Sequence, residues 1–241
     1  MYRDNRRITL LLTGLLIVFI HINTLAQDDT DTICESFADA TPSTFIGAGN
    51  AYFESGDFTR AIEVYTCAID LEPDYAPTYV SRGYAYASQR NDDLALADYE
   101  QALSIDANLV SAYNNRGLLY TTRGSFAQAL ADFDLAIALD PEYALAYYNR
   151  GIVHAAESSY ELALADLNRV LEIDPTFAEA HAAIGAVHVA LALESYDNFQ
   201  STAGELAVPP GGSANIVLRA LQEARAADSF TPWLPLQTPA Q

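Results

Sequence analysis

The chain has 241 residues, of which 51% are hydrophobic and 18% charged, so it can bury a substantial core without many crosslinks. Its 32 acidic residues outnumber 12 basic ones, all of them arginine, and the formal net charge is −20. This charge argues against nucleic acid or an anionic membrane surface as a partner, because both would repel the chain. Two cysteines exclude a disulfide-rich scaffold and a four-cysteine zinc site.

The N-terminus has the pattern of an export signal. Three arginines within the first seven residues precede an apolar stretch over 8–22, and Thr-Leu-Ala follows at 24–26. This pattern predicts a signal peptide over 1–26, followed by an acidic N-terminal arm over 27–41. The alternative is an uncleaved membrane anchor, since residues 8–26 carry no charge. We therefore expect an exported, bacterial-type protein, located in the periplasm, at the cell surface or outside the cell.

A 34-residue period organises the middle of the chain. Arg-Gly pairs stand at 82–83, 116–117 and 150–151, and Gly49 and Gly185 continue the glycine series in both directions. Small residues later in each unit recur at the same interval: Ala61, Ala95, Ala129 and Ala163, then Pro73, Pro141 and Pro175, with Ala107 as a departure. The period defines four units, 42–75, 76–109, 110–143 and 144–177.

Each unit is predicted to form two helices. In the unit 110–143, aromatic and aliphatic residues recur at helical spacing on either side of a polar turn at 123–125. Pro141 ends the second helix, because proline disfavours helical backbone in the residue before it. One such pair cannot bury its apolar faces alone, so neighbouring pairs must stack.

These residues resemble those of the tetratricopeptide repeat family. The shared pattern is an aromatic residue, glycine and tyrosine in the first helix, alanine, an aromatic residue and alanine in the second, and then proline. The resemblance covers 42–177 and implies an all-α fold, a right-handed α-solenoid of antiparallel helix pairs. It also implies a non-enzymatic, cofactor-free scaffold that binds a protein or peptide segment in the concave groove lined by the first helices.

The predicted groove residues are the first-helix positions that packing does not use: Asn50, Val80, Ser81, Tyr84, Asn114, Asn115, Leu118, Tyr148, Asn149 and Ile152. Binding through this groove predicts exposed aromatic side chains. Asn115 and Asn149 match an asparagine ladder that holds peptide backbone in some relatives, whereas Ser81 and Gly47 depart from it. The alternative is that some of the apolar members pack against the insertion expected at 194–213 or against the chain's own tail, which contains Trp233, Leu234 and Leu236.

The region 178–232 is predicted to be an interrupted fifth repeat, followed by a proline-rich tail over 233–241. Residues 178–193 have the first-helix pattern, and a second helix is predicted over 214–228. Three residues in or after that second helix have the same spacing as Ala129, Ala136 and Pro141 of the third unit. They are Ala220, Ala227 and Pro232. The intervening residues 194–213 are expected to form a surface loop. The alternative is a set of capping helices.

Cys34 and Cys67 are the two cysteines, and both lie in the part expected to be exported. An oxidising compartment would permit a disulfide between them. The bond would attach the acidic arm to the second helix of the first unit. The alternative is two free thiols.

No catalytic or metal site is predicted. His181 and His188 are seven residues apart without a third ligand at helical spacing. Three aspartates recur at the repeat interval on the second helices, which indicates either solvated helix faces or polar contacts between helices: Asp98, Asp132 and Asp166. An enzyme built on the predicted loop would have Glu194, Asp197 and Glu205, with no base or nucleophile beside them.

A second hypothesis belongs to another functional class. The solenoid could stack on itself through its apolar end or its groove and serve as a homo-oligomeric, structural subunit of the cell envelope. A mass that rises with protein concentration, without added ligand, would favour this hypothesis over the scaffold.

Overall fold

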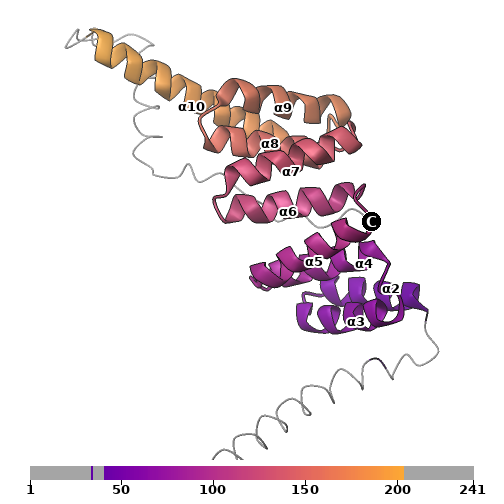
Figure 1. Cartoon of the computed structure of the whole chain (residues 1–241). Coiled ribbons are helices and arrows are strands. Elements are labelled where there is room, and N and C mark those ends of the chain that lie inside the picture. The colour runs from indigo at the N-terminus through magenta and orange to yellow at the C-terminus, as the bar shows by residue number, and fades with distance from the viewer. Residues whose placement is uncertain (1–33, 35–40, 204–241) are drawn as a thin grey trace, which may run out of the picture. The chain divides into compact units, whose positions relative to one another are not determined.

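The computed structural model describes Cys34 and residues 41–203 (Figure 1). The predicted signal peptide, most of the acidic arm, the segment 214–228 and the tail lie outside the described residues. The regular structure of the described part is helical throughout, and its helices are α2 (Pro42–Glu54), α3 (Phe58–Leu71), α4 (Ala76–Ser88), α5 (Asp92–Ile105), α6 (Val110–Thr122), α7 (Phe126–Leu139), α8 (Ala144–Ala156), α9 (Tyr160–Ile173) and α10 (Ala178–Ala203).

The chain divides into two compact units, residues 1–107 and 108–241. In the N-terminal unit α2 packs on α3 and α4 on α5, and in the C-terminal unit α6 packs on α7 and α8 on α9. Each predicted repeat therefore holds one helix pair. The predicted all-α fold class of helical repeats is confirmed.

The turn inside each repeat has a left-handed residue at the same repeat position. These residues are Gly56, Arg90, Gly124 and Ser158, with φ between 60° and 81°. The next residue in each repeat is the N-cap of the second helix: Asp57, Asn91, Ser125 and Ser159. All four are residue types that favour an N-cap, so the turn ends one helix and begins the next.

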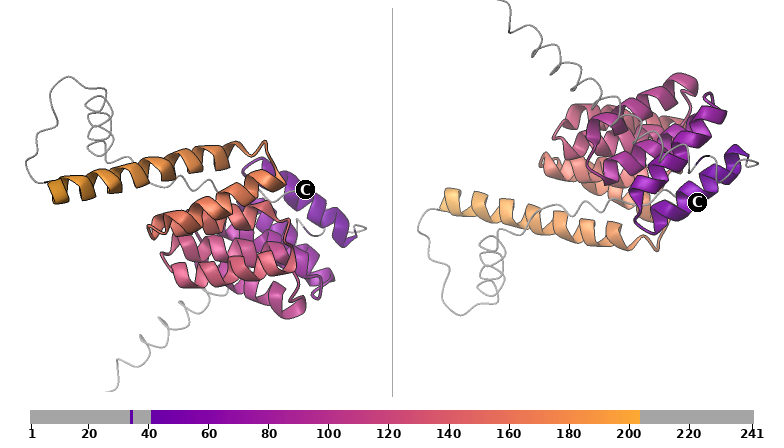
Figure 2. Two further views of the ribbon diagram at one scale, coloured as in Figure 1. Left: turned by 90° about the horizontal axis from the view of Figure 1, so that it is seen from above. Right: turned by 90° about the horizontal axis from the view of Figure 1, so that it is seen from below.

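The fifth repeat lacks both turn signals, and its first helix does not stop where we predicted. The corresponding positions hold Ala192 and Leu193, and α10 continues through them to Ala203. Alanine disfavours left-handed backbone, and leucine is a poor N-cap. The prediction of a loop over 194–213 is therefore wrong for its first part, 194–203. Figure 2 shows the C-terminal half of α10 extending beyond α8 and α9.

The glycine of the first helix lies against a large side chain of the second helix in the same repeat. A Cβ atom added at Gly117 would lie 2.7 Å from Cε1 of Phe133, and one at Gly83 would lie 2.8 Å from Cε1 of Tyr99. Both rings are buried. The glycines therefore permit a helix approach that no larger residue would allow.

Gly117→Ala is expected to lower the free energy of unfolding by about 2 kcal/mol, because the added methyl group overpacks against Phe133. The control substitution Gly47→Ala, at an exposed position of α2, is expected to raise it by up to about 1 kcal/mol. No atom of the described residues lies within 4 Å of a Cβ at Gly47, so the gain in helix propensity is unopposed there. Urea denaturation followed by circular dichroism measures both changes, and equal shifts would contradict the close-approach argument.

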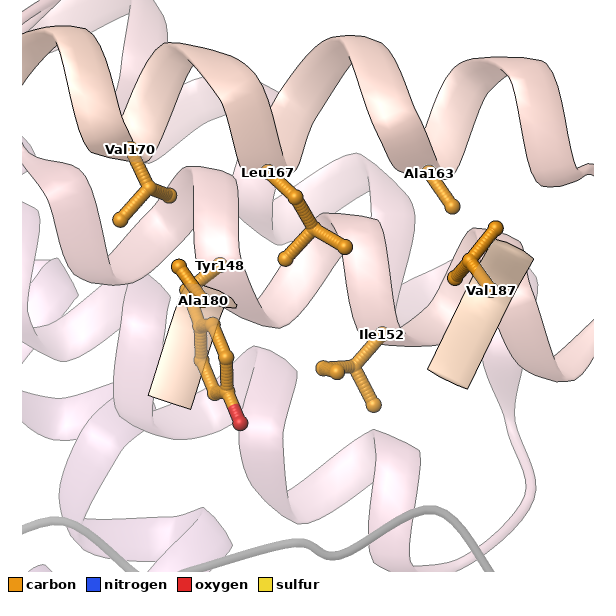
Figure 3. Packing of buried hydrophobic residues seen from close by; sticks show 7 residues of the cluster. All are labelled: Tyr148, Ile152, Ala163, Leu167, Val170, Ala180 and Val187. Atoms are coloured by element: carbon orange, nitrogen blue, oxygen red, sulfur yellow. The ribbon is translucent and has the colours of Figure 1, made fainter. Parts of the chain in front are cut away.

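Helix α10 completes the hydrophobic core at the C-terminal side of the fourth repeat. Figure 3 shows the cluster, to which three helices contribute side chains: Tyr148 and Ile152 of α8, Ala163, Leu167 and Val170 of α9, and Ala180 and Val187 of α10. One face of α10 is thus buried against the fourth repeat.

Candidate protein-binding surface

Arginines of three first helices pair with aspartates on the second helices of the same repeats. The pairs are Arg82–Asp98, Arg116–Asp132 and Arg150–Asp166. In each pair Nε donates to one carboxylate oxygen at 2.8 Å and Nη2 donates to the other at 2.6–2.8 Å. The aspartates are only 4–6% exposed. The sequence left two interpretations of these aspartates, solvated helix faces or polar contacts between helices, and the structure shows the polar contacts.

Arg82 and Arg150 also contact the second helix of the preceding repeat. Nη1 of Arg82 donates to Thr66 Oγ1 at 3.1 Å, and Nη1 of Arg150 donates to Asp134 at 2.6 Å. Hydrogen bonds to Asp166 raise the pKa of Arg150 above its usual range. Each of the two therefore fixes the position of its own repeat relative to the previous one, and we assign these residues a structural role.

The first repeat replaces this ion pair by apolar residues and a disulfide. The positions of the arginine and aspartate hold Ala48 and Val64, which pack in one cluster with Phe45 and Cys67. Cys34 and Cys67 are joined by a disulfide with their Cα atoms 5.7 Å apart. The arm is thereby attached to α3 at the residue that we expected.

The predicted surface residues of the N-terminal unit differ in accessibility. Asn50 is exposed, and its Oδ1 accepts a hydrogen bond from the Tyr65 hydroxyl at 2.7 Å. Ser81 is half-buried, and its hydroxyl donates to the carbonyl of Pro77 at 3.2 Å. Val80 is buried. The polar residues are thus the accessible ones in this unit.

Helices α6 and α8 of the C-terminal unit carry three linked asparagines. Nδ2 of Asn149 donates to Oδ1 of Asn114 at 2.9 Å, and Nδ2 of Asn114 donates to Oδ1 of Asn115 at 3.3 Å. Asn114 and Asn149 are buried, whereas Asn115 is half-buried. The bonds orient the amides in a row that ends at the accessible Asn115. Leu118 and Ile152, also predicted for this surface, are buried.

The expectation of exposed aromatic side chains on the first helices is wrong. Tyr84 is 5% and Tyr148 4% exposed. The Tyr84 ring lies 4.9 Å from that of Phe53, and the Tyr148 ring lies 5.3 Å from that of Phe177. Phe53 could have been noticed in the sequence, because the other repeats hold small residues at its position: Ala87, Thr121 and Ala155.

Tyr99 provides a test of packing in the second repeat. Burial raises the pKa of Tyr99 above 10.0, with smaller contributions from Tyr84 and Asp98. Above pH 10 an unfolded tyrosine loses its proton while the folded one keeps it, so stability is present below pH 10 and falls above it. Above pH 10 the free energy of unfolding of the wild type should therefore fall more steeply than that of Tyr99→Phe, by about 1.4 kcal/mol per pH unit. Urea denaturation between pH 8 and 11 measures both slopes. An unchanged slope would contradict the burial of this hydroxyl.

The described residues provide no metal site and no membrane span. Within residues 34 and 41–203, no group of three potential ligands could hold a metal ion. His181 and His188 are both exposed on α10. Over the same part of the chain, none of the helices has the length and apolar character needed to cross a bilayer. Glu194 lies on α10, and Asp197 and Glu205 have no described side chain.

The geometry defines a helical-repeat protein, and sequence comparison identifies the repeat. Family profiles described as TPR repeat or tetratricopeptide repeat match residues 49–90, 83–147 and 144–177. The chain belongs to the tetratricopeptide repeat family. No curated protein matches the sequence. Tetratricopeptide repeats are typically non-catalytic modules of protein interaction.

Solved structures with the same kind of fold include two at low identity. The pilF protein of Pseudomonas aeruginosa is 19% identical with a TM-score of 0.59, and the match covers 77% of this chain and 86% of pilF. A MamA protein is 21% identical with a TM-score of 0.54, covering 80% and 98%. These two similarities show the fold alone. The first TPR of Spaghetti (RPAP3), solved with an HSP90 peptide, is 32% identical with a TM-score of 0.47, covering 48% and 93%.

Proposed function

We propose that this chain is a non-enzymatic scaffold that binds an extended peptide or protein segment along its first helices. The observation that carries the proposal is the row of amides from Asn149 through Asn114 to Asn115. A side-chain amide offers both a donor and an acceptor, which is what the backbone of an extended segment requires. The hydrogen bonds within the row keep these amides oriented before a partner binds, which lowers the entropic cost of binding.

The charge of the chain favours a neutral or basic partner. The formal net charge is −20, and lysine is absent from the sequence. Arg82, Arg116 and Arg150 are engaged by aspartates of their own repeats. A partner held mainly through its carboxylates would therefore meet few available cations, whereas a basic segment would be attracted.

A selection from a displayed library of random peptides, followed by affinity measurement, tests the proposal. We expect Asn115→Ala to weaken the selected peptides about five- to ten-fold, since it removes one hydrogen-bonding amide worth about 1 kcal/mol. Asn168→Ala is the matched control, because Asn168 is exposed on the second helix α9. Equal affinities for the two variants would contradict binding at the amide row.

We also propose that the protein is exported through its bacterial-type N-terminal segment. The disulfide between Cys34 and Cys67 supports this proposal, because disulfides persist in oxidising compartments. Intact-mass analysis of the protein recovered from the cell envelope or culture medium should give a chain that begins at Gln27 and contains the bond. Recovery of full-length protein only, from the cytoplasm and with free thiols, would contradict export.

A further inference from the structure

We infer that the exposed face of α10 around Gly185 is the docking site of the chain's own segment 214–228, which completes a fifth repeat. In the preceding repeats the equivalent glycine is covered by a side chain of the second helix. Phe133 lies against Gly117, and Leu167 lies against Gly151. At Gly185 no atom of the described residues lies within 4 Å of an added Cβ, and the residue is exposed.

The two faces of α10 have different surroundings. Ala180 and Val187 are buried against the fourth repeat. The exposed face around Gly185 contains Ala182 and Val189, of which Val189 is 39% exposed, and the exposed histidines His181 and His188. The two histidines hold the positions of Tyr147 and His154, which flank Gly151 on α8 in the fourth repeat. Among the described residues, no second helix occupies this face of α10.

The segment 214–228 has the spacing required of the missing second helix. Ala220 and Ala227 correspond to Ala129 and Ala136 of α7, positions that are fully buried in the third repeat. Leu221 corresponds to Leu130. These correspondences give the segment an apolar stripe at helical spacing.

Contacts at the proposed docking site would differ from those inside the earlier repeats. The position of the paired arginine holds Ile184, which is half-buried, the position of its aspartate holds Glu223, and the position of Phe133 holds Ala224. The arginine–aspartate pair is therefore absent, and a small residue replaces the ring. In the proposed arrangement Glu223 lies beside His188, as Asp166 lies 3.9 Å from His154 in the fourth repeat.

The connection is long enough for the segment to fold back. Helix α10 continues from Ala192, the position of the turn in other repeats, to Ala203, which is about 17 Å at a rise of about 1.5 Å per residue. Residues 204–216 can span about 40 Å when extended. They include the turn-forming sequence Pro-Pro-Gly-Gly at 209–212. Such a tether gives the segment a millimolar effective concentration at α10, which favours it over a partner in solution.

Hydrogen exchange of the full chain, followed by mass spectrometry, tests this inference. The amides of 217–227 should exchange about ten-fold or more slowly than in an unstructured peptide. Gly185→Leu should abolish that protection, because its side chain fills the docking face while leucine favours the helix itself. Gly47→Leu is the matched control, since Gly47 is also an exposed helix position, where no atom of residues 34 and 41–203 lies within 4 Å of an added Cβ. This variant should leave the protection unchanged.

Three results would overturn the inference. The first is unprotected exchange of 217–227 in the wild type. The second is protection that persists in Gly185→Leu, which would mean that the segment forms its helix elsewhere. The third is protection that grows with protein concentration, which would assign the face of α10 to a second copy of the chain.

Discussion

Asp132→Ala is expected to lower the free energy of unfolding by about 3 kcal/mol, because it removes the buried carboxylate that compensates the charge of the Arg116 guanidinium between two packed helices. Asp132 is 4% exposed and accepts two hydrogen bonds from Arg116. The Arg116 side chain is 20% exposed, so water compensates for only part of the loss. Chemical denaturation followed by circular dichroism measures the change.

The first repeat suggests a double variant that separates the effect of the uncompensated charge from the effect of lost packing. Its own residues at these two positions are Ala48 and Val64. Arg116→Ala/Asp132→Val should therefore cost about 1 kcal/mol, less than Asp132→Ala, since no buried charge remains. Asp134→Ala is a surface control, because Asp134 is 61% exposed, and it should cost less than about 1 kcal/mol. A double variant as unstable as the single one would contradict this account of the pair.

Reduction of the disulfide is expected to destabilise the N-terminal unit by about 3 to 4 kcal/mol, because the bond restricts the unfolded chain. Cys34 and Cys67 are 33 residues apart. Thermal unfolding with and without a phosphine reductant measures this effect. Cys34→Ser should unfold at the lower temperature under both conditions.

A thiol titration tests whether the disulfide is present. Two reactive thiols per denatured, unreduced chain would show that the cysteines are not bonded. The protein for this experiment should be prepared from an oxidising compartment, since reducing cytoplasm prevents the bond from forming.

The repeats and their helices could be predicted from the sequence because their signals are local. The regular repeat period, the helical spacing of apolar residues and a proline after three of the four second helices are sufficient. The extension of α10 could also have been predicted, from the absence of a left-handed residue at Ala192 and of an N-cap at Leu193. Both signals can be recognised only after the turns of the other repeats are compared.

The accessible part of the candidate surface could not be predicted in the same way. The burial of Tyr84 depends on Phe53 of the previous repeat, and that of Tyr148 depends on Phe177 before α10. These contacts join residues that are far apart in the sequence. The recurrence of Arg116 and Asp132 was visible, but only the packing of α6 on α7 brings them together.

Site-specific photocrosslinking in the native cell tests the central claim, which is that the first-helix face binds a partner protein. A photoreactive amino acid at position 115 reports on the amide row, and one at position 168 reports on the exposed side of α9. We predict that position 115 gives an adduct with a different protein and that position 168 gives none. Adducts of equal yield from both positions, or adducts from position 115 with other copies of this chain alone, would contradict the claim.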